Sequence, residues 1–190
     1  MTQQTSDDQV IGRPAYATAA SVAAIESSIA SVSSDIATLN EESWTNLVLG
    51  SDFSTTSDSD TNVTGLSFTP VANTTYLIEA YCLLRTETAI VGPRLGMSTP
   101  SGCDGAYNIM VPNSNTAMAF QAQGAMGDAP ANAASLGVPL TTASYLGTIN
   151  AVIVTGSSPS GDVQVTLASA VAGTSVTIRT GSFLRYRTIS

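Results

Sequence analysis

The sequence contains no histidine and no lysine, and all six of its basic residues are arginines. Histidine is the commonest general base, and lysine is the residue that forms Schiff bases. Their absence therefore excludes both kinds of catalysis, together with the Ser-His-Asp triad and histidine metal sites. Glycine-rich phosphate-binding motifs are also missing. The sequence predicts a protein that is not an enzyme and that needs no cofactor.

Carboxylates alone provide the remaining catalytic alternative, because glycoside hydrolysis needs only a pair of acids. The acids that could form such a pair are Glu79, Glu87, Asp104 and Asp128. A Ser- and Thr-rich turn holds further acids that could bind Ca²⁺ weakly, although their spacing matches no known calcium loop. These turn acids are Asp52, Asp58 and Asp60. Solvated surface acids explain both groups, so we predict no catalytic and no metal-binding residue.

Charged side chains are scarce, at 11% of the chain with a net charge of −8, whereas about 25% charged residues is typical. Nucleic-acid binding requires a basic patch that displaces counterions from phosphates, which an acidic chain without lysine does not offer. The sequence also has no run of about 18 apolar residues and no signal-peptide pattern at its start. We therefore expect neither nucleic acid nor membrane as a partner, and synthesis as a soluble cytosolic product.

Cysteine is equally scarce, with only Cys82 and Cys103 in the chain. Two cysteines do not make a disulfide framework, and Cys82 lies within an apolar stretch. We expect both to be buried free thiols.

Between Ala15 and Leu39 the sequence has no proline or glycine, and apolar residues recur at alternating spacings of three and four. This repeat is typical of a coiled-coil seam, and its β-branched residues at both the a and the d positions favour three strands over two. The seam residues are Val22, Ile25, Ile29, Val32, Ile36 and Leu39. The sequence predicts a short trimeric coiled coil over residues 21–42. An amphipathic helix packed on its own head is the alternative.

In the segment 1–20, the first fourteen residues are mostly polar and include Asp7, Asp8, Arg13 and Pro14. Such a segment buries too little apolar surface to order by itself. We predict an extended arm that anchors the chain to another protein.

From Trp44 onward the apolar pattern changes to a period of two, interrupted by turn residues. The expected strands span residues 44–53, 63–68, 75–86, 91–97, 107–111, 116–124, 144–155, 162–169, 175–180 and 183–189. Many short strands at this spacing predict a mainly β head, an antiparallel β-sandwich or jelly roll, over residues 43–190. The connection 124–142 has no clear period and is a candidate for surface contacts.

Two of the expected strands, 75–86 and 144–155, are apolar on both faces. A strand shared between a core and a subunit interface has this pattern. In the second strand, Ile149 and Ile153 oppose Leu146, Val152 and Val154. The predicted head interface consists of Leu77, Tyr81, Leu83, Ile149 and Ile153. The alternative is a second face covered by a long loop of the same chain.

Several segments of the head resemble the C-terminal domains of tailed-bacteriophage fibre and decoration proteins. These segments are Trp44 to Leu49, Thr64 to Pro70, Thr75 to Ala80, Leu84 to Thr86, Val91 to Arg94 and Val176 to Arg187. The resemblance covers about residues 44–190 and lies in the order of strands and turns, without catalytic residues. It implies a homotrimeric β-sandwich knob on a helical stem, with the N-terminus anchored to the virion.

The chain lacks the repeats and the extended shaft of long tail fibres. This departure favours a capsid-attached head fibre or a decoration (cement) protein over a receptor-binding tail tip. The expected partners are further copies of the chain and capsid or tail proteins contacted by the arm. A host surface glycan or protein is the partner in the tail-tip alternative. The expected location is the virion surface, after synthesis in the host cytoplasm.

Overall fold

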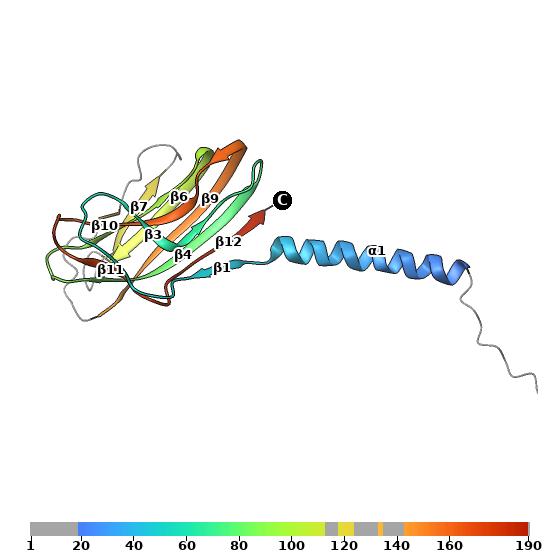
Figure 1. Ribbon diagram of the computed structural model, residues 1–190, viewed down its shortest axis with the longest axis horizontal. Coiled ribbons are helices and arrows are strands. Elements are labelled where there is room, and N and C mark those ends of the chain that lie inside the picture. The colour runs from blue at the N-terminus through green and yellow to red at the C-terminus, as the bar shows by residue number, and fades with distance from the viewer. Residues whose placement is uncertain (1–18, 113–117, 124–132, 135–142, 190) are drawn as a thin grey trace, which may run out of the picture. The chain divides into compact units, whose positions relative to one another are not determined.

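The computed structural model describes residues 19–112, 118–123, 133–134 and 143–189. The chain divides into two compact units, Met1–Asn40 and Glu41–Ser190, and each is described by itself. The described part of the first unit is helical and contains most of helix α1. The second unit is built mainly from strands (Figure 1).

Helix α1 spans Ala19–Glu42 and includes all of the predicted seam. Its many alanines and the absence of glycine and proline favour helix, whereas its serines lower the helix propensity. One of these serines, Ser28, donates a hydrogen bond from its hydroxyl group to the carbonyl oxygen of Ala24 (3.0 Å). This bond satisfies the serine hydroxyl within the helix itself. No helix among the described residues is long and apolar enough to cross a membrane.

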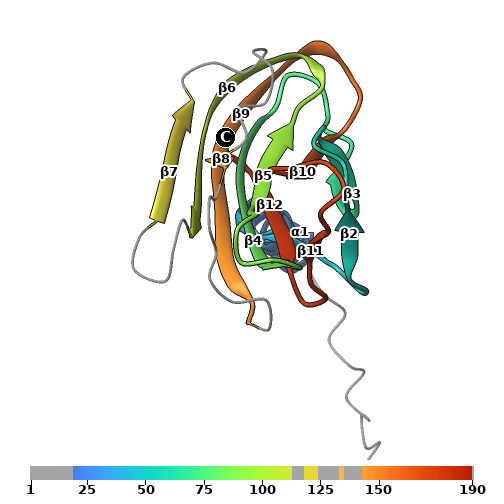
Figure 2. The ribbon, with the colours of Figure 1, turned by 90° about the vertical axis from the view of Figure 1, so that its left-hand side faces the viewer.

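The second unit contains two antiparallel sheets within its described part. The larger has the strand order β1-β12-β4-β9-β6-β7, with β11 pairing with β4 and β2; the smaller has the order β3-β10-β5-β8. The long strands β4, β9 and β6 lie side by side (Figure 2). The strands are β1 (Thr45–Val48), β2 (Phe53–Thr55), β3 (Thr61–Phe68), β4 (Thr75–Thr86), β5 (Pro93–Ser98), β6 (Ser101–Pro112), β7 (Met118–Gln123), β8 (Ala133–Ala134), β9 (Tyr145–Ser160), β10 (Val163–Ser169), β11 (Val176–Ile178) and β12 (Phe183–Ile189).

One hydrophobic core joins the inner faces of the two sheets. Leu66, Leu95 and Leu167 come from the smaller sheet and are fully buried. They belong to the same cluster as Ile78 and Ile109 of the larger sheet. Burial of one such side chain contributes about 1.5–3 kcal/mol. The predicted mainly β, antiparallel head is confirmed, and its two sheets enclose their core as a sandwich does.

The strand expected over 75–86 coincides with β4. By contrast, the single strand expected over 44–53 is divided, because β1 ends at Val48 and β2 begins at Phe53. Between them the backbone N–H of Leu49 donates to Ser182 (2.8 Å), and Gly181 donates to Leu49 (3.0 Å). These bonds to a distant segment turn the chain where the local sequence alone reads as continuous strand.

The predicted interface role of Ile149 and Ile153 is wrong, because both side chains are fully buried in the core. In the pairing of β9 with β4, Ile149 lies opposite Ala80 and Ile153 opposite Tyr76, and these partners are also buried. Side chains alternate between the two faces of a strand. A strand that is apolar on both faces does not show by itself which face is inside, and the pairing with β4 decides it.

Candidate interaction surfaces

All six seam side chains of α1 are exposed, with exposed fractions from 41% for Val22 to 66% for Leu39. The others are Ile25, Ile29, Val32 and Ile36. An isolated helix of this length is marginal in water, and exposed apolar side chains do not stabilise it. A contiguous row of large exposed aliphatic side chains marks a candidate interaction site.

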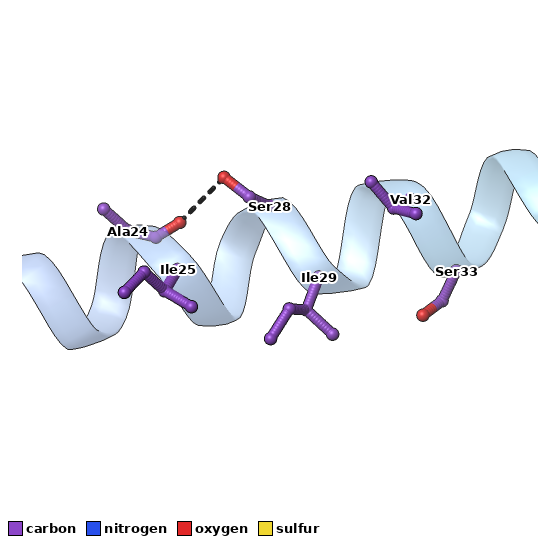
Figure 3. Close-up of a pocket in the computed structure, with 6 residues that line it drawn as sticks. All are labelled: Ala24, Ile25, Ser28, Ile29, Val32 and Ser33. Atoms are coloured by element: carbon purple, nitrogen blue, oxygen red, sulfur yellow. Dashed lines mark hydrogen bonds between the residues drawn. The ribbon is translucent and has the colours of Figure 1, made fainter.

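A shallow groove runs along this seam and is lined by Ala24, Ile25, Ser28, Ile29, Val32 and Ser33. Figure 3 shows Ile25 and Ile29 projecting from the same side of the helix. In the heptad, Ile29 occupies position a, Ile25 and Val32 the flanking d positions, and Ser28 position g. Four residues of this kind form the hole that receives a side chain of a neighbouring helix in knobs-into-holes packing. The groove thus has the residue positions of such a hole.

The outer face of the larger sheet is the second apolar surface. It consists of the side chains of β1, β12, β4, β9 and β6 that point away from the core, together with Trp44. Several large apolar residues on it are exposed, in contrast to the polar outer face that antiparallel sheets usually show to water. They are Val48 (62%), Leu83 (36%), Met110 (36%), Leu146 (48%), Val152 (42%), Val154 (46%) and Ile189 (37%). The predicted interface residues Leu77 and Tyr81 lie half-buried on the same face, beside Leu83.

A polar row crosses the middle of this outer face. Its members Arg185, Glu79, Asn150 and Asn108 stand opposite one another on neighbouring strands. The Arg185 guanidinium donates to Glu79 Oε2 from Nε (2.8 Å) and from a terminal nitrogen (2.5 Å). Tyr81 Oη donates to the same oxygen (3.2 Å), and Asn150 donates to Asn108 (3.3 Å). The hydrogen bond that Arg185 donates to Glu79 raises the pKa of Arg185.

Trp44 marks the end of the outer face at which the chain enters the head. The guanidinium of Arg185 lies 4.4 Å from the centre of the Trp44 ring, and that of Arg187 lies 5.5 Å from it. Both distances suit a cation–π interaction. Arg187 pairs with no carboxylate among the described residues, and its Nε is buried without a hydrogen-bond partner there.

The described acids among the four that could have formed a carboxylate pair do not converge. Glu79 is bound to Arg185, and Glu87 accepts a hydrogen bond from the backbone of Ser175 (3.2 Å). Asp104 lies two strands away and four residues beyond the position opposite Glu79, a distance of roughly 13 Å along the strand alone. Inverting glycosidases need their carboxyl groups within about 9.5 Å. Asp128 lies outside the described residues.

The turn acids have structural contacts. Asp52 accepts a hydrogen bond from the backbone N–H of Thr180 (2.8 Å) and lies 3.8 Å from the Arg179 guanidinium. The backbone carbonyl of Asp58 accepts a hydrogen bond from Arg94 (2.9 Å). Over the described ranges, no group of three or more acids and cysteines could hold a metal ion.

Both cysteines are free thiols, as expected. Cys82 is fully buried, and this burial raises the pKa of its thiol to about 12. Cys103 is only partly buried, so the expectation that it lies in the core is wrong. It sits on β6 next to a register shift, where the strand departs from regular pairing.

The predicted anchor residues Asp7, Asp8, Arg13 and Pro14 lie outside the described residues, as does most of the 124–142 connection.

In the described part, sequence reasoning missed the exposed Met110 and the cluster of Trp44 with the two arginines. The alternation of β9 did place Leu146, Val152 and Val154 on one face. Knowing which face was outside would have been enough to find them.

No family model matches the chain, and no curated protein matches it. Among solved structures, the crystal structure of the infectious bursal disease virus VP2 subviral particle aligns at 14% identity and a TM-score of 0.19. The Gx strain of the same virus aligns at 12% identity and a TM-score of 0.18. Each alignment covers 78% of this chain, which spans little more than a third (37% and 36%) of those proteins. TM-scores this low assign neither a family nor a function.

Proposed function

We propose that the chain is a structural protein of a virus particle that assembles as a homotrimer through α1. The observation that carries the proposal is the exposed seam, where all six a and d side chains are at least 41% exposed. Burying them between three helices removes apolar surface from water at about 25 cal/mol per Å². β-branched residues at both positions favour three helices over two.

The virion role is supported by the resemblance of residues 44–190 to phage fibre and decoration domains. A low content of charged residues and a mainly β head suit such a surface component. In this proposal the arm before α1 binds the particle, α1 gathers three chains, and the heads face outward. Three weak arms acting together bind far more tightly than one, because the second and third contacts form at high effective concentration.

A capsid-attached head fibre or decoration protein is the form we favour, because the given sequence shows none of the repeats expected of a long tail fibre. The alternative, a receptor-binding tail tip, would use the 124–142 connection to hold a host glycan or protein. Imaging the subunit on its particle separates the two. A position on the capsid supports the first, and a position at the tail tip supports the second.

The oligomeric test is a charge placed in the seam. Ile29→Asp puts a carboxylate in the middle of the proposed helix contact, where its burial is strongly unfavourable. Ala30→Asp puts the same charge one residue away, at a b position outside the seam. Light scattering should give three times the 19.4 kDa chain mass for the parent and for Ala30→Asp. It should give a mass that falls towards the monomer for Ile29→Asp.

Two results would contradict the trimer. A monomeric parent chain would favour a helix that packs on its own head. Equal masses for the parent and the Ile29→Asp chain would show that the seam does not hold the copies together.

A further inference from the structure

We infer that the outer face of the larger sheet packs against the head of a second copy of this chain, with the Arg187 edge of one head beside the Asp104 edge of the next. This inference rests on the proposed trimer and deepens it. It names the surface through which the heads, as distinct from the helices, contact one another.

The first support is the apolar content of the face. Val152 and Val154 on β9 and Leu146 at its start are each more than 40% exposed, and Leu83 and Met110 on the neighbouring strands are each 36% exposed. In the register, Leu83 stands opposite Leu146, and Leu77 opposite Val152. The apolar residues thus form continuous rows across strands rather than isolated points. A contiguous apolar surface of this kind marks an interaction site.

The second support is the state of the polar row between the apolar rows. Glu79 accepts hydrogen bonds from Arg185 and Tyr81, and Asn150 donates to Asn108. These groups pair within one head, so covering them leaves few unpaired donors or acceptors. A buried polar group is strongly unfavourable only when it loses its partners. Burying this face therefore carries a small free-energy penalty from polar groups, although a charged pair lies at its centre.

The occupant is indicated by charge near the two edges of the face, on strands that are each second from the end of the sheet. Arg187 lies on β12, and Asp104 lies on β6, three strand spacings across the sheet. Among the described residues neither has an oppositely charged partner; Asp104 only accepts a hydrogen bond from the backbone N–H of Gly105 (2.7 Å). In a closed ring of three, each contact joins two different surfaces of the same subunit. The cationic edge of one head then meets the acidic edge of its neighbour.

In the proposed trimer, the short connection between α1 and the head keeps the heads within reach of one another. α1 ends at Glu42, and Trp44 already lies against Arg185 and Arg187 on the outer face. Two residues span at most about 7 Å. If α1 joins three chains, this short connection tethers the three heads to one another. Weak contacts between faces then suffice, because the heads are tethered at high effective concentration.

Thiol protection tests whether the face is covered. In a full-length Cys103→Ser chain, Val152→Cys places a thiol on the face, and Val171→Cys places one on a connecting loop outside it, at a parent exposure of 53%. Cys82 is buried and does not compete. We expect maleimide to label Val152→Cys at least ten times more slowly than Val171→Cys. Adding Ile29→Asp should remove most of that difference.

Equal labelling rates in a chain that light scattering shows to be a trimer would overturn the inference and leave the proposed function standing. Equal rates in a chain that proves to be a monomer would show that both have failed.

A cross-link tests the pairing of the two edges. Within one head, three spacings separate the two positions by roughly 14 Å, too far for a disulfide, which needs Cα atoms within about 7 Å. In the Cys103→Ser background, Arg187→Cys combined with Asp104→Cys should therefore give covalent trimers on oxidation, seen on a denaturing gel. Each single variant should stay a monomer on that gel. A double variant that is a trimer in solution and does not cross-link would overturn the edge pairing.

Discussion

Arg185 connects several parts of the head. It pairs with Glu79 across two strands, its guanidinium lies over the ring of Trp44, and it lies 5.9 Å from the ring of Tyr81. A two-nitrogen contact with a carboxylate has a fixed geometry as well as charge. Through these contacts Arg185 holds Trp44, the second residue after α1, against the outer face of the head.

Because of Cys82, the head should become less stable at alkaline pH. Its thiol has a pKa of about 12 when folded and 9.0 in the reference state. As the pH rises, the thiol therefore ionises in the unfolded chain before it ionises in the folded head, and this favours unfolding. The stability that the neutral thiol gives the head is complete below pH 9 and is lost as the pH rises towards 12. At pH 10 the loss is about 1.4 kcal/mol.

The check is chemical denaturation of the parent and of Cys82→Ala at pH 7 and pH 10. Every other titrating group is common to both proteins and cancels in the comparison. The parent should lose about 1.4 kcal/mol more than the variant. The same loss in both would mean that the Cys82 thiol ionises in the folded head.

At the scale of elements, β6 and β9 approach so closely that they leave no space for a side chain at Gly105. A Cβ atom there would lie 2.9 Å from Ile153 Cα and closer still to the carbonyl oxygen of Val152. The φ angle of Gly105 is 143°, which other residues rarely adopt. Gly105→Ala should therefore lower the free energy of unfolding by about 2–3 kcal/mol.

Gly50→Ala is the matched control, because a Cβ atom at Gly50 would meet nothing within 4 Å. Urea denaturation should show a clear drop in the midpoint for Gly105→Ala and little change for Gly50→Ala. Equal midpoints would mean that β6 and β9 separate without penalty at this position.

Helix α1 and the head differ in how they are stabilised. The head has a shared core with many fully buried side chains. The described side chains of α1 are all exposed, and its serines weaken it further. An isolated helix of this kind is marginal in water, whereas the head buries its core without the helix. In the trimer we propose, α1 would set the register of the copies and the outer faces would add contact area.

For the whole molecule, the arm is predicted to be the attachment segment. A chain lacking residues 1–18, which precede α1, should keep its trimeric mass, because the seam and the head are intact. It should no longer bind particles prepared without this protein, measured by co-sedimentation with the full-length chain as the positive control. Undiminished binding of the shortened chain would place the attachment site elsewhere.

The parts that could be predicted from sequence are those that local pattern encodes. The spacing of Val22, Ile25 and Ile29 indicates a helix with one apolar stripe, and the two-residue period after Trp44 indicates strands. β4 was predicted to the residue for that reason. The absence of histidine and lysine likewise narrows the possible chemistry, because a side chain that the sequence lacks cannot act as a base or a nucleophile.

The tertiary structure decided what local pattern leaves open. Which face of β9 is buried depends on its register with β4, and this register places Ile149 and Ile153 inside and Val152 outside. The division of 44–53 into two strands depends on hydrogen bonds to Ser182 and Gly181, more than 100 residues away. The sequence by itself determined the helix, most of the strands and the apolar seam, because these follow from side-chain periodicity. Only the pairing of distant segments decided where 44–53 divides and which apolar side chains of the outer face remain exposed.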